Sequence, residues 1–136
     1  MGERRKDCVT LLICLIYMLN QETKRNITRI VNENILDGAL HAMFKRGLLP
    51  DWFEKHFAGY ISLYGMLPSL TDLFIGALEF HLVRFYYFGA YANMNIMLTD
   101  DSCDKYLRQM EIEPDRAREW ARILEEEILK RMEKKH

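Results

Sequence analysis

The sequence predicts a mainly α-helical single domain. Apolar residues recur at helical spacing in successive stretches of the chain, and residues that start or stop helices separate these stretches. The chain has 136 residues, and a chain of this length can bury a sizeable core without disulfides or a structural metal. We therefore expect residues 1–136 to form one domain, with an N-terminal half over 9–67 and a C-terminal half over 68–136.

Composition and charge exclude several classes of protein. Hydrophobic residues make up 49% of the chain, and 19 Lys and Arg balance 20 Asp and Glu. These values exclude collagen-like, low-complexity and disordered chains. Three cysteines without CxxC spacing indicate a reduced, cytoplasmic protein. The apolar run over 11–19 is shorter than the roughly 20 residues that a bilayer requires, so we expect no membrane partner.

The first third of the chain predicts three helices in close succession. Residues 9–20 are apolar on nearly all sides and predict a buried helix. Residues 21–33 predict a short amphipathic helix with Thr23 as its N-cap. Residues 35–44 repeat the helical period. The following Lys45-Arg46-Gly47 predicts the end of this helix, because cations suit the negative end of the helix dipole and Gly accepts the left-handed conformation.

Residues 48–68 support two interpretations, one for each half of the segment. Asp51 with Glu54 three residues later is typical of a capping box, which predicts a short helix through Phe57. Residues 59–65 contain aromatic and β-branched side chains between two glycines, which favours a short strand. The sequence leaves open whether this region is a wing strand or a helix.

The next segment is the most aromatic part of the chain. A proline, a serine cap and an acid in the first turn predict a helix that begins at Leu70. We expect this helix to run to about Phe88 and to continue past Gly89 to Leu98. Because it is apolar nearly all round, it should lie at the centre of the core or at a homodimer interface. The candidate packing residues on it are Phe80 and Tyr87.

Two further helices complete the predicted domain. Residues 99–102 are typical of a loop with a cap, and a short helix is expected over 103–110. Residues 114–135 predict a long helix with proline and acids at its start and basic residues at its end. Its single apolar stripe must pack on the rest of this chain or on a second copy. The candidate packing residues of the stripe are Trp120, Leu124 and Ile128.

Charge is unevenly distributed along the chain. Residues 1–50 hold eight Lys or Arg against five acids, residues 51–100 hold two against five, and residues 101–136 hold nine against ten. The first third is therefore mildly basic. A contact with a polyanion is expected there.

No motif of enzyme chemistry occurs in the sequence. The four histidines have no metal-ligand spacing with one another or with the cysteines. A Gly-rich phosphate loop, a nucleophile elbow and a helix motif of paired carboxylates are all absent. We therefore expect a non-enzymatic protein without catalytic residues, metal or cofactor.

A resemblance to a known family rests on the order of elements in the first third. Residues 34–49 resemble the recognition helix of winged helix-turn-helix transcriptional regulators of the PadR-like and MarR-like groups, in which an Ala-Leu pair is followed by Gly-Leu-hydrophobic. Tyr60-Ile61-Ser62-Leu63, shortly before Leu70-Thr71, is similar to their second wing strand and the helix after it. The resemblance covers roughly residues 9–75.

The resemblance implies a small DNA-binding transcriptional regulator that acts as a homodimer on double-stranded DNA. The helix over 35–46 would enter the major groove, with His41 as a reader of base edges. Phosphate contacts supply position and much of the affinity. The cations that would make them are Lys24, Arg25, Arg29, Lys45 and Arg46.

A second hypothesis is an all-α bundle without a wing that serves as a protein-interaction module. Its docking surface would be the C-terminal stripe or an aromatic surface around Trp52, Phe53, Tyr60 and Tyr64. Small helical subunits of larger nucleoprotein assemblies and viral accessory proteins belong to this class. Salt-sensitive DNA binding favours the first hypothesis, whereas a large exposed apolar patch favours the second.

Overall fold

The computed structural model describes residues 5–24, 33–55, 79–88 and 91–133, and the statements below concern these residues. The described chain is mainly helical, as predicted, with one two-stranded antiparallel sheet. Residues 51–55 are also helical. The elements are α1 (Arg5–Thr23), α3 (Glu33–Lys45), β1 (Val83–Phe88), β2 (Tyr91–Ile96), α6 (Asp100–Gln109) and α7 (Pro114–Glu133).

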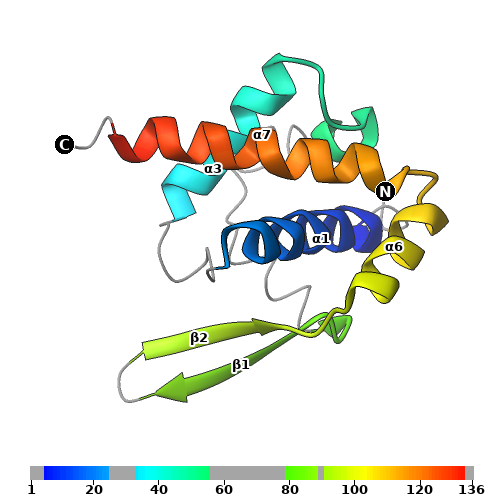
Figure 1. Cartoon of the computed structure of the whole chain (residues 1–136), viewed down its shortest axis with the longest axis vertical. Coiled ribbons are helices and arrows are strands. Elements are labelled where there is room, and N and C mark those ends of the chain that lie inside the picture. The colour runs from blue at the N-terminus through cyan, green and yellow to red at the C-terminus, as the bar shows by residue number, and fades with distance from the viewer. Residues whose placement is uncertain (1–4, 25–32, 56–78, 89–90, 134–136) are drawn as a thin grey trace.

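The helices form one body and the two strands form an arm. α7 packs against both α1 and α3, and α6 packs against α1 and α7. Figure 1 shows α7 running alongside α1, with α3 crossing it. The hairpin of β1 and β2 extends away from the helices on the far side of α1 from α7 (Figure 1). The order of elements therefore places the hairpin between the N-terminal and C-terminal helices of the body.

α1 is the central helix of the core. Every residue from Cys8 to Ile16 is buried, so α1 is covered on all its faces over more than two turns. Thr10 is the one polar residue within that run. This confirms the predicted buried helix, because a helix that is apolar all round has no face suited to water.

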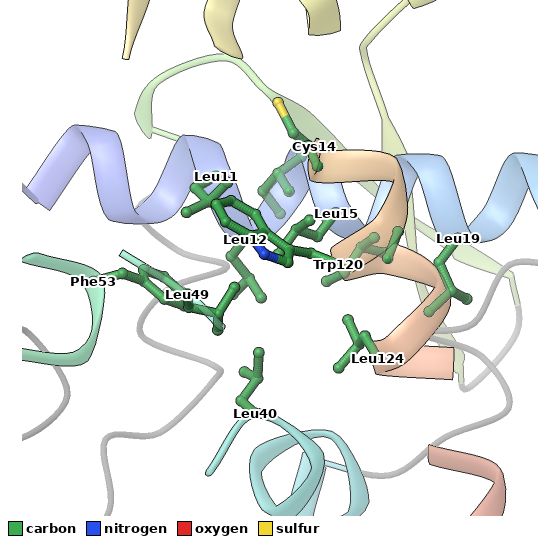
Figure 2. Close-up of a cluster of buried hydrophobic side chains, with 14 of the residues drawn as sticks. Leu11, Leu12, Cys14, Leu15, Leu19, Leu40, Leu49, Phe53, Trp120 and Leu124 are labelled. Carbon is green, nitrogen blue, oxygen red and sulfur yellow. The ribbon is translucent and has the colours of Figure 1, made fainter. Parts of the chain in front are cut away.

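The core forms where α7 lies between α1 and α3 and packs against both. Figure 2 shows Trp120 and Leu124 of α7 reaching toward Leu12 and Leu15 of α1, with Leu40 of α3 below them. All five of these side chains are at most 5% exposed. The predicted packing residues Trp120, Leu124 and Ile128 are thus buried inside this chain. α1 and α3 cover most of the apolar stripe of α7, and Leu129 of the stripe is 50% exposed.

The predicted N-cap at Thr23 is wrong. Thr23 is the last residue of α1, and its hydroxyl donates a hydrogen bond to the carbonyl of Leu19 at 2.9 Å. Lys24 follows with a φ of 57°, the left-handed conformation that ends many helices. The Thr23 hydroxyl therefore bonds back to the preceding turn of α1 and does not cap a following helix. The helix predicted over 21–33, with Arg25 and Arg29, lies mostly outside the described residues.

The helix predicted over 35–44 is confirmed as α3, and its end has the predicted cause. Gly47 has a φ of 67°, and the N–H of Leu48 donates to the carbonyl of Met43 at 3.3 Å. The helix at 51–55 confirms the helical half of the ambiguous segment. It starts one residue earlier than a capping box at Asp51 requires, because the carbonyl of Pro50 already accepts from Phe53 and Glu54. The strand predicted over 59–65 lies outside the described residues.

The predicted aromatic helix is wrong from residue 80 onward. Residues 83–88 and 91–96 form an antiparallel pair in which Val83 lies opposite Ile96 and Phe88 opposite Tyr91. A stretch that is apolar all round has no periodicity that separates helix from strand, and its β-branched and aromatic residues favour the strand. Tyr87 is therefore a strand residue opposite Ala92. The predicted start of this helix at Leu70 lies outside the described residues.

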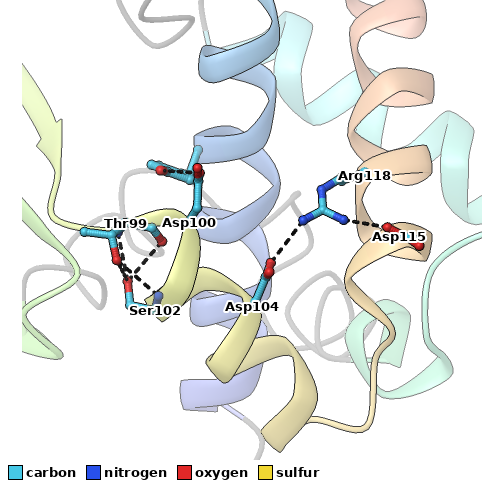
Figure 3. Close-up of polar contacts among 7 residues, drawn as sticks. Thr99, Asp100, Ser102, Asp104, Asp115 and Arg118 are labelled. Carbon is cyan, nitrogen blue, oxygen red and sulfur yellow. Dashed lines mark hydrogen bonds and ion pairs between the residues drawn. The ribbon is translucent and has the colours of Figure 1, made fainter.

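The loop and cap predicted over 99–102 are confirmed, and they start α6 three residues earlier than expected. Thr99 and Ser102 form a reciprocal capping box (Figure 3), in which the N–H of Ser102 donates to Thr99 Oγ1 at 3.1 Å and the N–H of Thr99 donates to Ser102 Oγ at 2.8 Å. Because Thr99 is the N-cap, Asp100 and Asp101 occupy the first turn, where acids favour the helix dipole.

α6 ends in a Schellman motif with an unusual residue. The N–H of Ile112 donates to the carbonyl of Leu107 at 2.9 Å, and the N–H of Glu111 donates to the carbonyl of Arg108 at 3.0 Å. Ile112 and Leu107 are both buried, which is the hydrophobic contact of this motif. Glu111 has a φ of 62° at the position where Gly is favoured. The turn from α6 to α7 is therefore built with backbone strain at Glu111.

Replacement of Glu111 by Gly should stabilise the protein. Gly accepts the left-handed conformation without the steric cost of a Cβ, so we expect Glu111→Gly to raise the free energy of unfolding by about 1 kcal/mol in urea titrations. Lys105→Gly is the control, because Lys105 is exposed in the interior of the same helix, and the substitution should lower the free energy of unfolding by about 1 kcal/mol. A destabilised Glu111→Gly variant would contradict the strain.

Candidate nucleic-acid interface

A polar hollow separates the C-terminal end of α1 from strand β2. Its volume is about 460 Å³. Four of its lining residues come from α1 and the residue after it, at spacings of three and four that place them on one helix face. The lining residues are Tyr17, Asn20, Gln21, Lys24, Asn95, Ile96 and Leu98. One face of α1 and the base of the hairpin therefore form the two walls.

Two hydrogen bonds fix the elements that carry these walls. The N–H of Met97 donates to the carbonyl of Leu82 at 2.7 Å, which closes the base of the hairpin. The hydroxyl of Tyr17 donates to Asp100 Oδ1 at 2.8 Å, which joins α1 to the start of α6. Burial and this hydrogen bond raise the pKa of Tyr17 to about 12. The phenol therefore stays protonated at physiological pH.

The charges of the hollow suit an anion. Among the described residues, Lys24 is the one charged group of the lining, and the carboxylate of Asp100 lies outside the lining, where it accepts a hydrogen bond from Tyr17. Lys24 is exposed. Asn20, Gln21 and Asn95 bring side-chain amides, which donate hydrogen bonds to phosphate and sugar oxygens in protein–DNA complexes. The arrangement can bind a phosphate by one ammonium and several neutral donors.

A second cationic cluster lies where α3 crosses α7. Glu127 is a buried residue of α7, and three cations surround its carboxylate. The nearest atoms are Arg131 Nη1 at 2.8 Å, Lys130 Nζ at 3.4 Å and Arg46 Nη1 at 3.5 Å. Burial alone would raise the pKa of Glu127, but the hydrogen bonds from Arg131 and Lys130 outweigh it and hold the pKa below its ordinary value. We call these four residues the Glu127 cluster.

Gly38 makes room for the Glu127 cluster on α3. A Cβ at Gly38 would lie 3.0 Å from Arg131 Nε, closer than ordinary van der Waals contact. The side chain of Arg131 therefore lies over the Gly38 position on its way to Glu127. His41, one turn later, is half-buried and packs edge-on against Phe44 at a ring separation of 5.5 Å. This face of α3 is occupied by packing within the chain.

The predicted DNA-binding residues do not form one surface. Arg46 belongs to the Glu127 cluster, and Lys45 is exposed beside it. Lys24 lies beside the hairpin. Figure 1 shows the C-terminal end of α3 on the opposite side of α7 from α1 and the hairpin. Arg25 and Arg29 lie outside the described residues.

The polar residues Asn20, Gln21 and Asn95 were missed as site residues by sequence reasoning. Asn95 interrupts an apolar stretch, which is a signal visible in the sequence. The α1 residues that line the same hollow lie far earlier in the chain, so the sequence does not bring them together with Asn95.

Phe80 is half-buried and packs against the core in the turn before β1, and the ammonium of Lys6 lies 5.8 Å from its ring centre. Phe80 therefore packs against the core, but from a turn and not from the predicted helix.

The cysteines are part of the packing. Cys8, Cys14 and Cys103 are free and buried. Cys14 of α1 and Cys103 of α6 interact, and the hydrogen bond between them, with burial, raises the pKa of the Cys14 thiol far above its ordinary value. A thiol that resists ionisation is a poor nucleophile. Within the described ranges, no group of three or more His, Cys, Asp or Glu is arranged to hold a metal ion.

Known proteins give no guide to the function of this chain. No family model, curated protein or solved structure matches this chain. In the part of the chain that the structure describes, none of the helices combines the length and the apolar character that a membrane span requires.

The Glu127 cluster should make stability depend on pH. Glu127→Gln keeps the shape of the side chain but removes its charge, so we expect a loss of about 2 kcal/mol in the free energy of unfolding at neutral pH. Because the pKa of Glu127 is lower in the folded chain than in the unfolded chain, its contribution is present above the ordinary Glu pKa of about 4.3 and is lost as the pH falls through the folded value. Urea unfolding at neutral and acidic pH measures both effects.

Asp115→Asn is the control for this experiment. Asp115 pairs with Arg118 at 2.6 Å, but its side chain is 96% exposed (Figure 3). An exposed pair of this kind contributes at most about 1 kcal/mol. Equal stability of Glu127→Gln and the unsubstituted protein at neutral pH would show that the cluster does not stabilise the crossing of α3 and α7.

Proposed function

We propose that the protein is a small, non-enzymatic DNA-binding regulator that contacts the phosphate backbone of double-stranded DNA through the hollow between α1 and β2. The observation that supports this most is the lining of the hollow, which combines Lys24 with three side-chain amides and no carboxylate. Phosphate groups are bound by this set of donors in protein–DNA interfaces. Arg25 follows Lys24 directly in the sequence and adds a second cation to the same part of the chain.

The hairpin beside the hollow supports the same function. The winged-helix resemblance implies a two-stranded wing next to the DNA, and β1 and β2 pair with each other in an arm that extends from the helical body (Figure 1). In this proposal the wing is formed by residues 83–96, and the strand expected near Tyr60 is not needed. A homodimer would double the number of cations that face the DNA, which suits a protein with a net charge of −1.

The end of α3 is a weaker candidate for the DNA-binding surface. Arg46, Lys130 and Arg131 already compensate the charge of Glu127. Lys130 and Arg131 also lie in the last turn of α7, where cations offset the negative end of the helix dipole. A phosphate there would approach two helix C-termini, which repel anions.

Lys24→Glu tests the proposed surface. We expect the protein to bind a mixed pool of duplex DNA in a fluorescence-anisotropy titration, and to bind more weakly at about 200 mM than at about 50 mM salt. The substitution should weaken binding at the lower salt about tenfold and reduce the salt slope by about one, because one phosphate contact is lost. Lys24 is exposed, so the fold should be unchanged.

Two control variants separate this surface from general electrostatics. Lys105 is exposed on α6 and does not line the hollow, so Lys105→Glu should change binding by less than about twofold. Lys45→Glu examines the end of α3. If Lys45→Glu abolishes binding while Lys24→Glu does not, the hollow is the wrong surface. Absence of binding by the unsubstituted protein at the lower salt would refute DNA binding altogether.

A further inference from the structure

A second concave surface lies on the helical body, and its character is apolar and acidic. It is a groove of about 470 Å³ between the 47–52 segment and the turn from α6 to α7. Trp52 and Trp120 both line it, so we call it the tryptophan groove. We propose that this groove binds a short peptide segment of a partner protein, in which one large apolar side chain is flanked by Lys or Arg.

The apolar walls of the tryptophan groove come from three elements. Leu48 and Trp52 are partly exposed on one wall, and Ile112 belongs to the other. Trp120 is 5% exposed and lies at the base. A half-exposed aromatic wall over a buried aromatic base is the kind of pocket that takes the central anchor residue of an interface.

The tryptophan groove is held in shape by the core. Phe53 is fully buried, and its ring lies 6.3 Å from Trp52 and 5.7 Å from Phe44. Cys8 Sγ lies 3.9 Å from the carbonyl oxygen of Trp52, which ties the 47–52 segment to α1. The Schellman motif at the end of α6 holds the opposite wall. A preformed pocket of this kind binds a ligand with little cost of ordering.

Charge complementarity identifies the chemistry of the occupant. Asp51, Glu111 and Glu113 line the groove and are exposed. The one cation of the lining, Arg116, lies over the ring of Trp120 at 5.7 Å. The rim is therefore acidic. It attracts Lys and Arg and repels phosphate, so a nucleic acid does not fit this surface.

The backbone of Glu111 belongs to the Schellman turn that forms one wall of the groove. Its φ of 62° is strained for any residue with a Cβ, and Gly would fit without cost. Lys24 has the same conformation at the end of α1, so the φ of Glu111 is explained by the end of α6. In this proposal the carboxylate of Glu111 binds a basic residue of the partner.

Selection of peptides on the full chain tests the proposal. A phage-displayed library of random peptides is selected on the immobilised protein, and the enriched peptides are synthesised with a fluorescent label and titrated while their fluorescence anisotropy is followed. We expect the enriched peptides to contain one Trp, Phe or Leu flanked by Lys or Arg. Enrichment of acidic or uncharged peptides, or no enrichment, would overturn the proposal.

Variants show whether the selected peptide occupies the groove. Glu111→Gly removes a carboxylate while it relieves strain, so it should weaken the peptide about threefold in a protein that is at least as stable. Trp52→Ala should weaken the peptide more than tenfold. Glu119→Gln is the matched control, since Glu119 is exposed on α7 outside the groove, and it should leave binding unchanged.

The alternative occupants have outcomes of their own. If sedimentation shows a dimer that Trp52→Ala dissociates and that excludes the selected peptide, the groove holds a second copy of the chain and the proposal is wrong. Unchanged peptide affinity in both Glu111→Gly and Trp52→Ala would place the peptide elsewhere. Lys24 lies outside the groove, so Lys24→Glu should not affect the peptide, and DNA binding and peptide binding can fail separately.

Discussion

The fold depends on the burial of α1 on every side. A helix with no polar face over residues 8–16 must be covered all round, and a single neighbour cannot do this. α7 covers one side with Trp120 and Leu124, α3 and the helix at 51–55 bring Leu40 and Phe53, and α6 packs near Cys14 (Figure 2). The other helices of the body are therefore arranged around α1.

The apolar faces of α3 and α7 are mostly buried, α3 against α7 and α7 against both α3 and α1, and the two proposed binding surfaces lie at the ends of helices and in turns. The hollow beside Lys24 is at the end of α1, and the tryptophan groove is at the junction of α6 and α7. The two surfaces have opposite electrostatic character. One brings an ammonium and amides, and the other brings three carboxylates, so they suit different ligands.

Much of the fold could be predicted from local signals, whereas most of the site could not. The Gly47 stop, the cap at Thr99 and the stripe with Trp120 depend on residues close together in the chain, and the structure confirms them. The predicted DNA-binding set rests on the winged-helix resemblance and on charge along the chain. It joins Lys24 at the end of α1 with Lys45 and Arg46 at the end of α3, and these two helix ends lie on different sides of α7 in Figure 1. Charge along a sequence carries no information about which helix ends meet.

The sequence by itself determined that the chain is mainly helical, where α3 ends, and that α1 is buried, because caps, dipoles and apolar periodicity act within a few residues. Only the tertiary structure decided the fate of residues 83–96, where an apolar, aromatic stretch suits helix and strand alike and pairing across the hairpin selects the strand. It also decided that Asn95 and Lys24 line the same hollow and that Arg46 pairs with Glu127. Contacts between residues so far apart depend on packing around α1, which no local pattern encodes.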